Sequence, residues 1–164
     1  GNVDAVTGFN FSSYLSLARL GIPEEDITTI LFAEHGVALY GNAVIVNTNF
    51  AEENPDAVTG ALRAIAKGWA DAIADPEAGA AAVLERNPAG DLDLETRRLQ
   101  LAIDGNVLTD YVMENGMGRI DMDRMATALE QLALTYDFQN EPDMSLYYTD
   151  AYLPEDEVLM VAPE

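Results

Sequence analysis

The stretch LYGNAVIVNT, residues 39–48, divides the chain into two parts of different character. Its apolar run from Ala43 to Val46 is mostly β-branched, and it stops at the turn-forming residues 47–49. A short run of this kind is typical of a strand that is buried on both faces of a sheet. Strand patterns precede this run and helix patterns follow it. The sequence therefore predicts an α/β fold, with three strands followed by a helical cap.

The residues before this stretch follow the order strand, helix, strand. A strand is predicted from the first residues to Gly8, and the helical spacing over 10–20 predicts a helix that Gly21 and Pro23 would end. The run ITTILFA, residues 27–33, predicts the second strand. This order is typical of a parallel strand-helix-strand unit.

The residues after the stretch carry helix signals. Asn-Pro and Asp-Pro starts predict helices over 55–73 and 76–86, and acidic starts predict two more over 93–104 and 121–136. The first of these helices has apolar residues at helical spacing that should form one buried stripe: Val58, Leu62, Ile65, Trp69 and Ile73. We expect a loosely structured tail from Asn140 and a frayed end from about Asp156.

The composition limits the possible partners and sites. The chain has 164 residues and a formal net charge of -21, from 29 acidic and 8 basic residues. So acidic a chain is not expected to bind nucleic acid or an anionic membrane surface, because both require a basic patch. The chain has no cysteine, which excludes disulfides and thiolate metal sites. No run reaches the roughly 18 apolar residues of a membrane span.

Catalytic motifs are mostly missing from the sequence. The glycine spacings match no phosphate-binding loop, and His35 is the only histidine. A catalytic triad or a histidine metal cluster would therefore need residues from elsewhere. On this basis we expect no catalytic residue, no metal site, no cofactor and no enzyme activity.

Polar and aromatic residues gather at two predicted strand ends, where open α/β sheets bind ligands. Gly8 lets the backbone approach a ligand, Phe9 or the nearby Phe11 can stack on one, and Asn10 and Ser12 offer polar contacts. Tyr40 and Asn42 flank the third predicted strand. The competing interpretation is that Phe11 is core and Gly8 only a turn. The predicted ligand-binding residues are Gly8, Phe9, Asn10, Ser12, Tyr40 and Asn42.

The order of several short segments resembles one protein family. VDAVTG at residues 3–8, HGV at 35–37, LYGNAVIVN at 39–47 and FAEENP at 50–55 are similar to periplasmic solute-binding proteins of ATP-driven importers. Within them the chain is most similar to the nitrate, sulfonate, taurine and thiamine-pyrimidine-precursor class. The resemblance implies part of a two-lobe periplasmic-binding-protein (type II) fold that closes on a small solute.

On this template the chain resembles only the C-terminal half of the family. Residues 1–36 resemble the end of the second lobe, 37–48 the hinge and return strand, and 49–164 the helical C-terminal part of the first lobe. The chain begins without an initiator Met or a leader. We therefore expect a missing N-terminal half of the same protein, which would supply the remaining strands.

The resemblance implies capture of a small solute for an ATP-driven importer, with a membrane permease as partner. The implied location is the periplasm, or an anchored position on the outer face of the cytoplasmic membrane. All eight basic residues lie outside the suspected binding loop in the sequence. That favours a planar heterocycle such as a thiamine pyrimidine precursor. The alternatives are taurine, an alkanesulfonate or nitrate, or a pyrimidine-biosynthesis enzyme on the same fold.

Overall fold

The computed structural model describes residues 3–140, 142–155 and 157–161. The chain divides into two compact units, and its backbone passes between them three times within these ranges. Unit 1 combines the N-terminal segment as far as Leu31 with Trp69–Thr109. Unit 2 combines Phe32–Gly68 with Asp110–Val161. Each unit is described by itself below.

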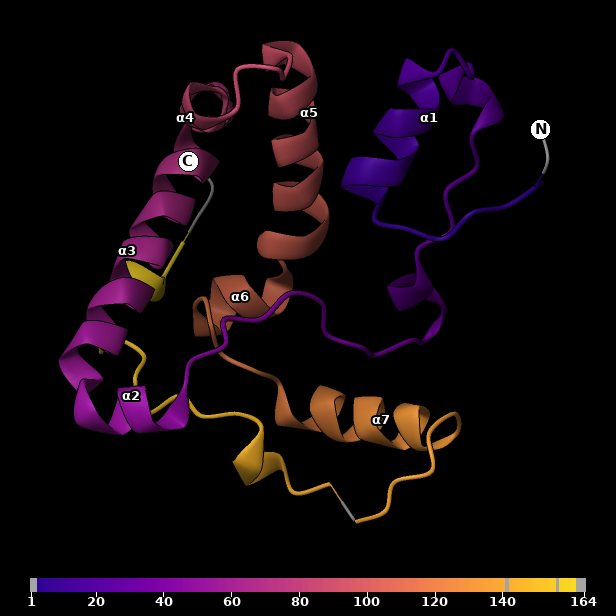
Figure 1. Ribbon diagram of the computed structural model, residues 1–164. Coiled ribbons are helices and arrows are strands. Elements are labelled where there is room, and N and C mark those ends of the chain that lie inside the picture. Colours follow the sequence, from indigo (N-terminus) through magenta and orange to yellow (C-terminus); the bar gives the residue numbers. More distant parts are fainter. Residues whose placement is uncertain (1–2, 141, 156, 162–164) are drawn as a thin grey trace. The chain divides into compact units, whose positions relative to one another are not determined.

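Unit 1 is built around a helix pair that lies side by side in Figure 1, α4 (Pro76–Arg86) and α5 (Leu92–Ala102). Gly79 permits their close approach, because a Cβ at this position would lie 2.9 Å from the Leu99 side chain. α5 also packs against the π-helical turn η1 (Asn10–Tyr14), and its C-terminal end continues into the π-helical turn η4 (Ile103–Val107). The remaining elements are α1 (Leu15–Arg19) and η2 (Glu24–Asp26). Leu15, Ala80 and Ile103 form its buried core.

Unit 2 contains most of the long helix α3 (Pro55–Ala74), which continues into unit 1 after Gly68. Small and medium apolar side chains form its core. Its other elements are η3 (Phe32–His35), α2 (Thr48–Glu53), α6 (Asp110–Asn115), α7 (Met122–Ala133), η5 (Met144–Leu146) and η6 (Glu157–Leu159). The buried apolar residues are Ala51, Val58, Ala66, Met117, Ala128, Leu159 and Val161.

Side-chain caps begin the helices. The Asp75 carboxylate accepts a hydrogen bond from Ala78 N at 3.0 Å, and Asp121 accepts from the amides of residues 123 and 124. These contacts satisfy backbone donors that a helix leaves free at its first turn, and they confirm two of the predicted helix starts. The helix predicted from Asp93 begins one residue earlier, because Asp91 provides its cap. α2 and α6 were not predicted, although Asn47 caps α2.

The predicted α/β fold is wrong. Among the described residues none forms a strand. The three segments expected to be strands are irregular chain, except that residues 32 and 33 of the second one begin the 3-10 helix η3. Their apolar side chains are exposed: Val6 is 58% exposed, Ile30 is 64% exposed and Ile45 is 91% exposed. A strand needs hydrogen-bonding partners from another segment, and these segments find none in the described chain. Residues 1 and 2 of the first predicted strand lie outside the described residues.

The tail is better packed than its composition suggests. Thr59 Oγ1 donates to Tyr152 O at 2.9 Å, and Met117 N donates to Leu159 O at 2.8 Å. Pro154, Leu159 and Val161 are buried. The expected loose tail and frayed end are therefore wrong for residues 152–161 as described, whereas Asp156 and residues 162–164 lie outside the described residues.

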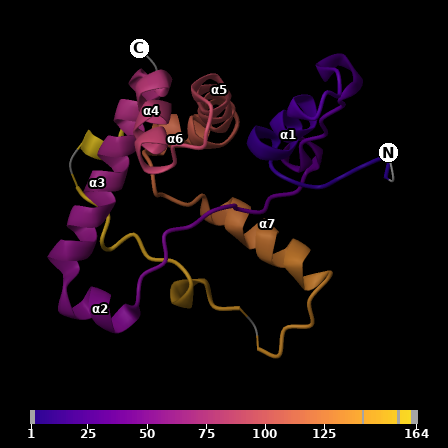
Figure 2. The same cartoon turned by 45° about the horizontal axis from the view of Figure 1, so that its top comes forward.

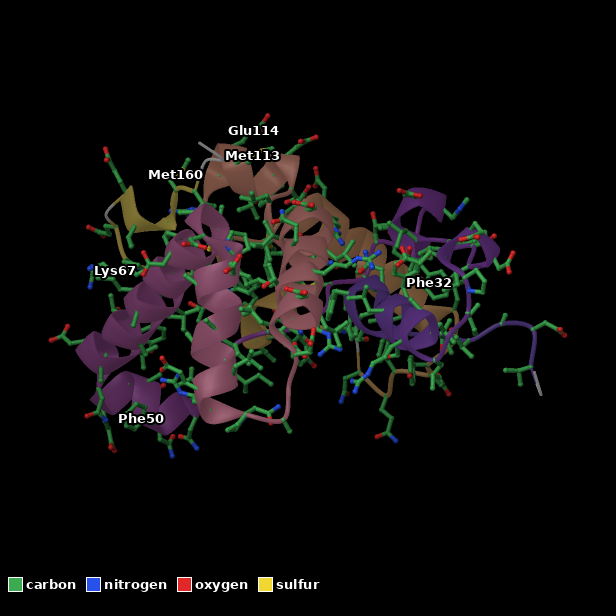
Figure 3. The ribbon with its side chains drawn as sticks, turned by 90° about the horizontal axis from the view of Figure 1, so that it is seen from above. Phe32, Phe50, Lys67, Met113, Glu114 and Met160 are labelled. Carbon is green, nitrogen blue, oxygen red and sulfur yellow. The ribbon has the colours of Figure 1, made fainter. Side chains whose placement is uncertain are left out.

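The predicted apolar stripe of α3 is only partly buried. In α3 Val58 is buried but Ile65 is 44% exposed. Phe32 and Phe50, both labelled in Figure 3, are also largely exposed in unit 2.

Within the described residues, no helix has the length and hydropathy that a bilayer crossing requires. The division into lobe and hinge segments at residues 36 and 48 stays a prediction.

Candidate functional site

Four of the six predicted ligand-binding residues lie together at the start of η1 in unit 1. Phe9 O accepts hydrogen bonds from Ser12 N and Ser13 N at 3.1 and 2.8 Å, which folds residues 9–13 into one tight turn. The Asn10 side chain accepts from Phe11 N at 2.8 Å. Gly8 is required here, because a Cβ would overlap the Ser13 hydroxyl group.

The aromatic rings of this turn stack on each other. The Phe9 and Phe11 ring centroids are 5.0 Å apart and their planes differ by 15°. Phe11 is half-buried, while Phe9 is 49% exposed. A stacked pair with an exposed outer ring is an apolar platform on which a flat group could bind. The half-buried Phe11 ring supports the Phe9 ring from one side. Phe9 presents the exposed surface on which a ligand could stack.

A polar cluster that sequence reasoning missed lies in the same unit. Arg97 forms a bidentate ion pair with Glu24, with donor-to-acceptor distances of 2.7 and 2.5 Å. The Tyr14 hydroxyl donates to the same carboxylate at 2.6 Å, and the guanidinium lies 5.8 Å from the Tyr14 ring centroid. The hydrogen bonds from Arg97 and then Tyr14 lower the pKa of Glu24 to about 2. The charge of Arg97 is therefore neutralised locally.

Tyr40 and Asn42 belong to unit 2, on an extended segment that α7 holds. Arg124 of α7 donates from Nε to Ala38 O and from Nη2 to Leu39 O, both at 3.0 Å. Its guanidinium carbon lies 4.3 Å from the Tyr40 ring centroid, within cation–π range. Figure 2 shows this chain running past α7. Asn42 is exposed on the chain just beyond this contact.

The Gln131 side chain and the Asp121 backbone amide also hold this segment against α7. Gln131 Nε2 donates to Gly36 O at 2.7 Å, and its Oε1 accepts from Ala38 N at 2.9 Å. Asp121 N donates to the Tyr40 hydroxyl at 3.0 Å. These side chains satisfy backbone groups that a neighbouring strand would otherwise satisfy. The segment is thus held extended without belonging to a sheet.

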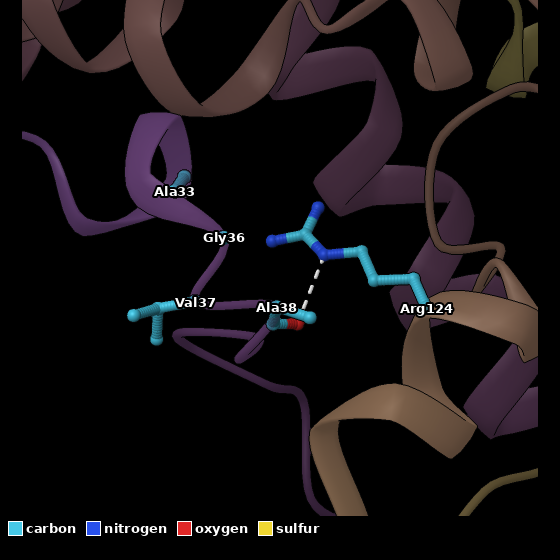
Figure 4. Close-up of a pocket in the computed structure, with 5 residues that line it drawn as sticks. All are labelled: Ala33, Gly36, Val37, Ala38 and Arg124. Atoms are coloured by element: carbon cyan, nitrogen blue, oxygen red, sulfur yellow. Dashed lines mark hydrogen bonds between the residues drawn. The ribbon is translucent and has the colours of Figure 1, made fainter. Parts of the chain in front are cut away.

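An open hollow lies beside this contact in unit 2. Ala33, Gly36, Val37, Ala38 and Arg124 line it, as Figure 4 shows, and its volume is about 330 Å³. Gly36 has a positive φ of 86°, and open space lies where its Cβ would be. The Arg124 guanidinium is the charged group among the residues that line the hollow.

The structure brings a cation beside one of the predicted ligand-binding residues, although that cation lies outside the suspected loop in the sequence. Arg124 is distant from Tyr40 in the sequence, yet its guanidinium covers the Tyr40 ring. No local spacing in the sequence could have indicated this pair, because 84 positions separate the two residues and the contact depends on tertiary packing. Among the described residues, no group of three His, Cys, Asp or Glu side chains could hold a metal ion.

Comparison with known proteins adds one finding. Residues 1–79, just under half of the chain, match the family model described as NMT1/THI5 like. This match is consistent with the solute-binding protein class. All six predicted ligand-binding residues lie within the matched range. Searches of curated proteins and of solved structures each found no match.

Proposed function

We propose that this chain is part of the solute-binding component of an ATP-driven importer. The observation that carries the proposal is the NMT1/THI5 like match, because it covers both the Phe9 turn and the Tyr40 segment. The resemblance in the sequence points to the same class. In this proposal the protein binds a solute and does not transform it, and it acts in the periplasm or on the outer face of the cytoplasmic membrane. A membrane permease would receive the solute.

The proposed solute contains a planar heterocycle, such as a thiamine pyrimidine precursor. The exposed Phe9 ring, supported by Phe11, supports this choice, since a flat solute can stack on it. Taurine, an alkanesulfonate or nitrate is the second candidate. The observation that favours the second candidate is Arg124 beside Tyr40, because a guanidinium is a strong partner for an oxyanion.

A thermal-shift panel tests solute capture. The panel contains pyrimidines, flavins, taurine, alkanesulfonates and nitrate. A ligand at about 100 times its dissociation constant should add roughly 2.7 kcal/mol to the free energy of unfolding, which gives a resolvable rise in melting temperature. The protein is expected to respond to at least one pyrimidine.

Two substitutions separate ring stacking from other modes of capture. Phe9→Ala should lower the stabilisation by the pyrimidine by at least about 1 kcal/mol of the roughly 2.7 kcal/mol, because stacking contributes on the order of 1 kcal/mol beyond the buried area. Leu20→Ala is the matched control, since Leu20 lies in the same unit and is 80% exposed. A shift that is unchanged in Phe9→Ala argues against stacking on this ring. A flat response to the whole panel argues against solute capture.

A further inference from the structure

The structure assigns Arg124 the recognition of an anionic group on the solute, with Tyr40 as the residue that positions its guanidinium. The inference rests on the proposed function and concerns the candidate site of unit 2 by itself. The group recognised is a carboxylate or sulfonate, held in the open hollow of unit 2 that Arg124 lines. In this inference Tyr40, one of the predicted ligand-binding residues, supports the cation.

The first argument is the charge state of the guanidinium. Its acceptors in the described part of the chain are the carbonyl oxygens of residues 38 and 39, so no carboxylate neutralises it there. The Asp121 carboxylate nearby in sequence instead accepts from the amides of residues 123 and 124. The positive charge of Arg124 therefore remains available to a solute.

The second argument is the number of remaining donors. A guanidinium carries five N–H groups, and these two backbone contacts use one from Nε and one from Nη2. The remaining N–H groups suit the two oxygens of a carboxylate or sulfonate. Because Tyr40 and the two carbonyl groups already fix the guanidinium, little side-chain entropy is lost when an anion binds.

The third argument is the charge of the extended segment. The chain has a net charge of -21, which disfavours anion binding in general. From Gly36 to Ala51, however, the sequence contains no Asp, Glu, Lys or Arg, so this segment adds no acidic side chain to the lining of the hollow. The acidic residues nearest in sequence to the lining are Glu34 and Asp123, and Arg124 is its cation.

The experiment compares matched solutes by isothermal titration calorimetry. Orotate and uracil share a ring and differ in a carboxylate, whereas propanesulfonate and propanesulfonamide differ in charge without a ring. The anionic member of at least one pair should bind at least about tenfold more tightly, and Arg124→Gln should reduce this ratio to about one.

Control variants distinguish recognition from support of the fold. Arg97→Gln removes the arginine of the other Arg–Tyr pair and should leave the ratio unchanged. Gln131→Ala loosens the same extended segment while keeping the Arg124 charge, so it should weaken both members of a pair alike. Tyr40→Phe keeps the ring under the guanidinium and should preserve the preference for the anion.

Three outcomes would overturn the inference. Equal affinity for both members of each pair overturns it while leaving solute capture intact. A preference that survives Arg124→Gln also overturns it, because another group must then recognise the anion. Dissociation constants above about 10 mM for all four compounds overturn it as well, and the thermal-shift panel then decides separately whether solute capture stands.

Discussion

The two arginine–tyrosine pairs of this protein have similar composition and different electrostatics. In unit 1 Arg97 lies 5.8 Å from the Tyr14 ring centroid and forms a bidentate ion pair with Glu24. In unit 2 Arg124 lies 4.3 Å from the Tyr40 ring centroid and donates to backbone carbonyl oxygens. A carboxylate neutralises the first cation, whereas no carboxylate of the described residues pairs with the second. The type of acceptor therefore decides which arginine can attract an anionic solute.

The pairs also differ in what they hold together. The Arg97 pair connects α5 to the segment that contains Tyr14 and Glu24, both of which follow the Phe9 turn. The Arg124 pair holds an extended chain through its backbone, together with Gln131. A carboxylate partner depends on pH, whereas backbone carbonyl groups do not titrate. The two contacts should accordingly respond differently to acid and to substitution.

The largest expected effect comes from the buried core of unit 1, the unit that contains the first pair. Leu15 follows Tyr14 and is 2% exposed, so Leu15→Ala leaves a cavity and should lower the free energy of unfolding by about 2–5 kcal/mol. Leu20→Ala, at an 80% exposed position of the same unit, should change it by less than about 0.5 kcal/mol. Urea titration measures both variants. Equal losses would show that Leu15 is not part of a packed core.

A smaller effect is expected where α7 holds the extended segment. Gln131→Ala removes the acceptor of the Ala38 amide, so hydrogen exchange at that amide should accelerate by up to about tenfold. Thr127→Ala is a control on the same helix, because the Thr127 hydroxyl donates within α7 to Asp123 O. Hydrogen exchange followed by NMR measures the Ala38 amide in both variants. An unchanged rate in Gln131→Ala would mean that this contact does not protect the segment.

The smallest expected effect is the pH dependence of the first pair, because both partners are solvent-exposed. The pKa of Glu24 is about 2, below its ordinary value of 4.5, so the folded state favours the ionised carboxylate. This stabilisation is fully present above pH 4.5 and is lost as the pH falls from 4.5 through 2. The melting temperature of the wild type should thus exceed that of Glu24→Gln slightly at pH 6.

The difference in melting temperature between wild type and Glu24→Gln should vanish as the pH approaches 2. Asp4→Asn is the control, since Asp4 is an exposed acid in the same unit. A constant difference between wild type and Glu24→Gln across this range would show that the ion pair is not linked to folding.

Local signals predicted most of the helices. Asp75-Pro76 and Asp121 begin α4 and α7 as expected, because a cap and the first turn lie within a few residues of each other. The same locality explains the Phe9 turn, in which Gly8, Phe9, Asn10 and Ser12 remain neighbours. A helix satisfies its backbone from its own segment, so its sequence carries most of the information that it needs.

Strands and long-range contacts depend on the tertiary structure. Ala43–Val46 has the composition of a buried strand, yet it is exposed because no described segment lies beside it to accept its hydrogen bonds. The position of Arg124 over Tyr40 likewise depends on how α7 packs against a distant segment. The sequence alone thus determined most of the helices, the acidic charge and the Phe9 turn. The tertiary structure decided which segments pair and which cation stays uncompensated, since both depend on residues far apart in the chain.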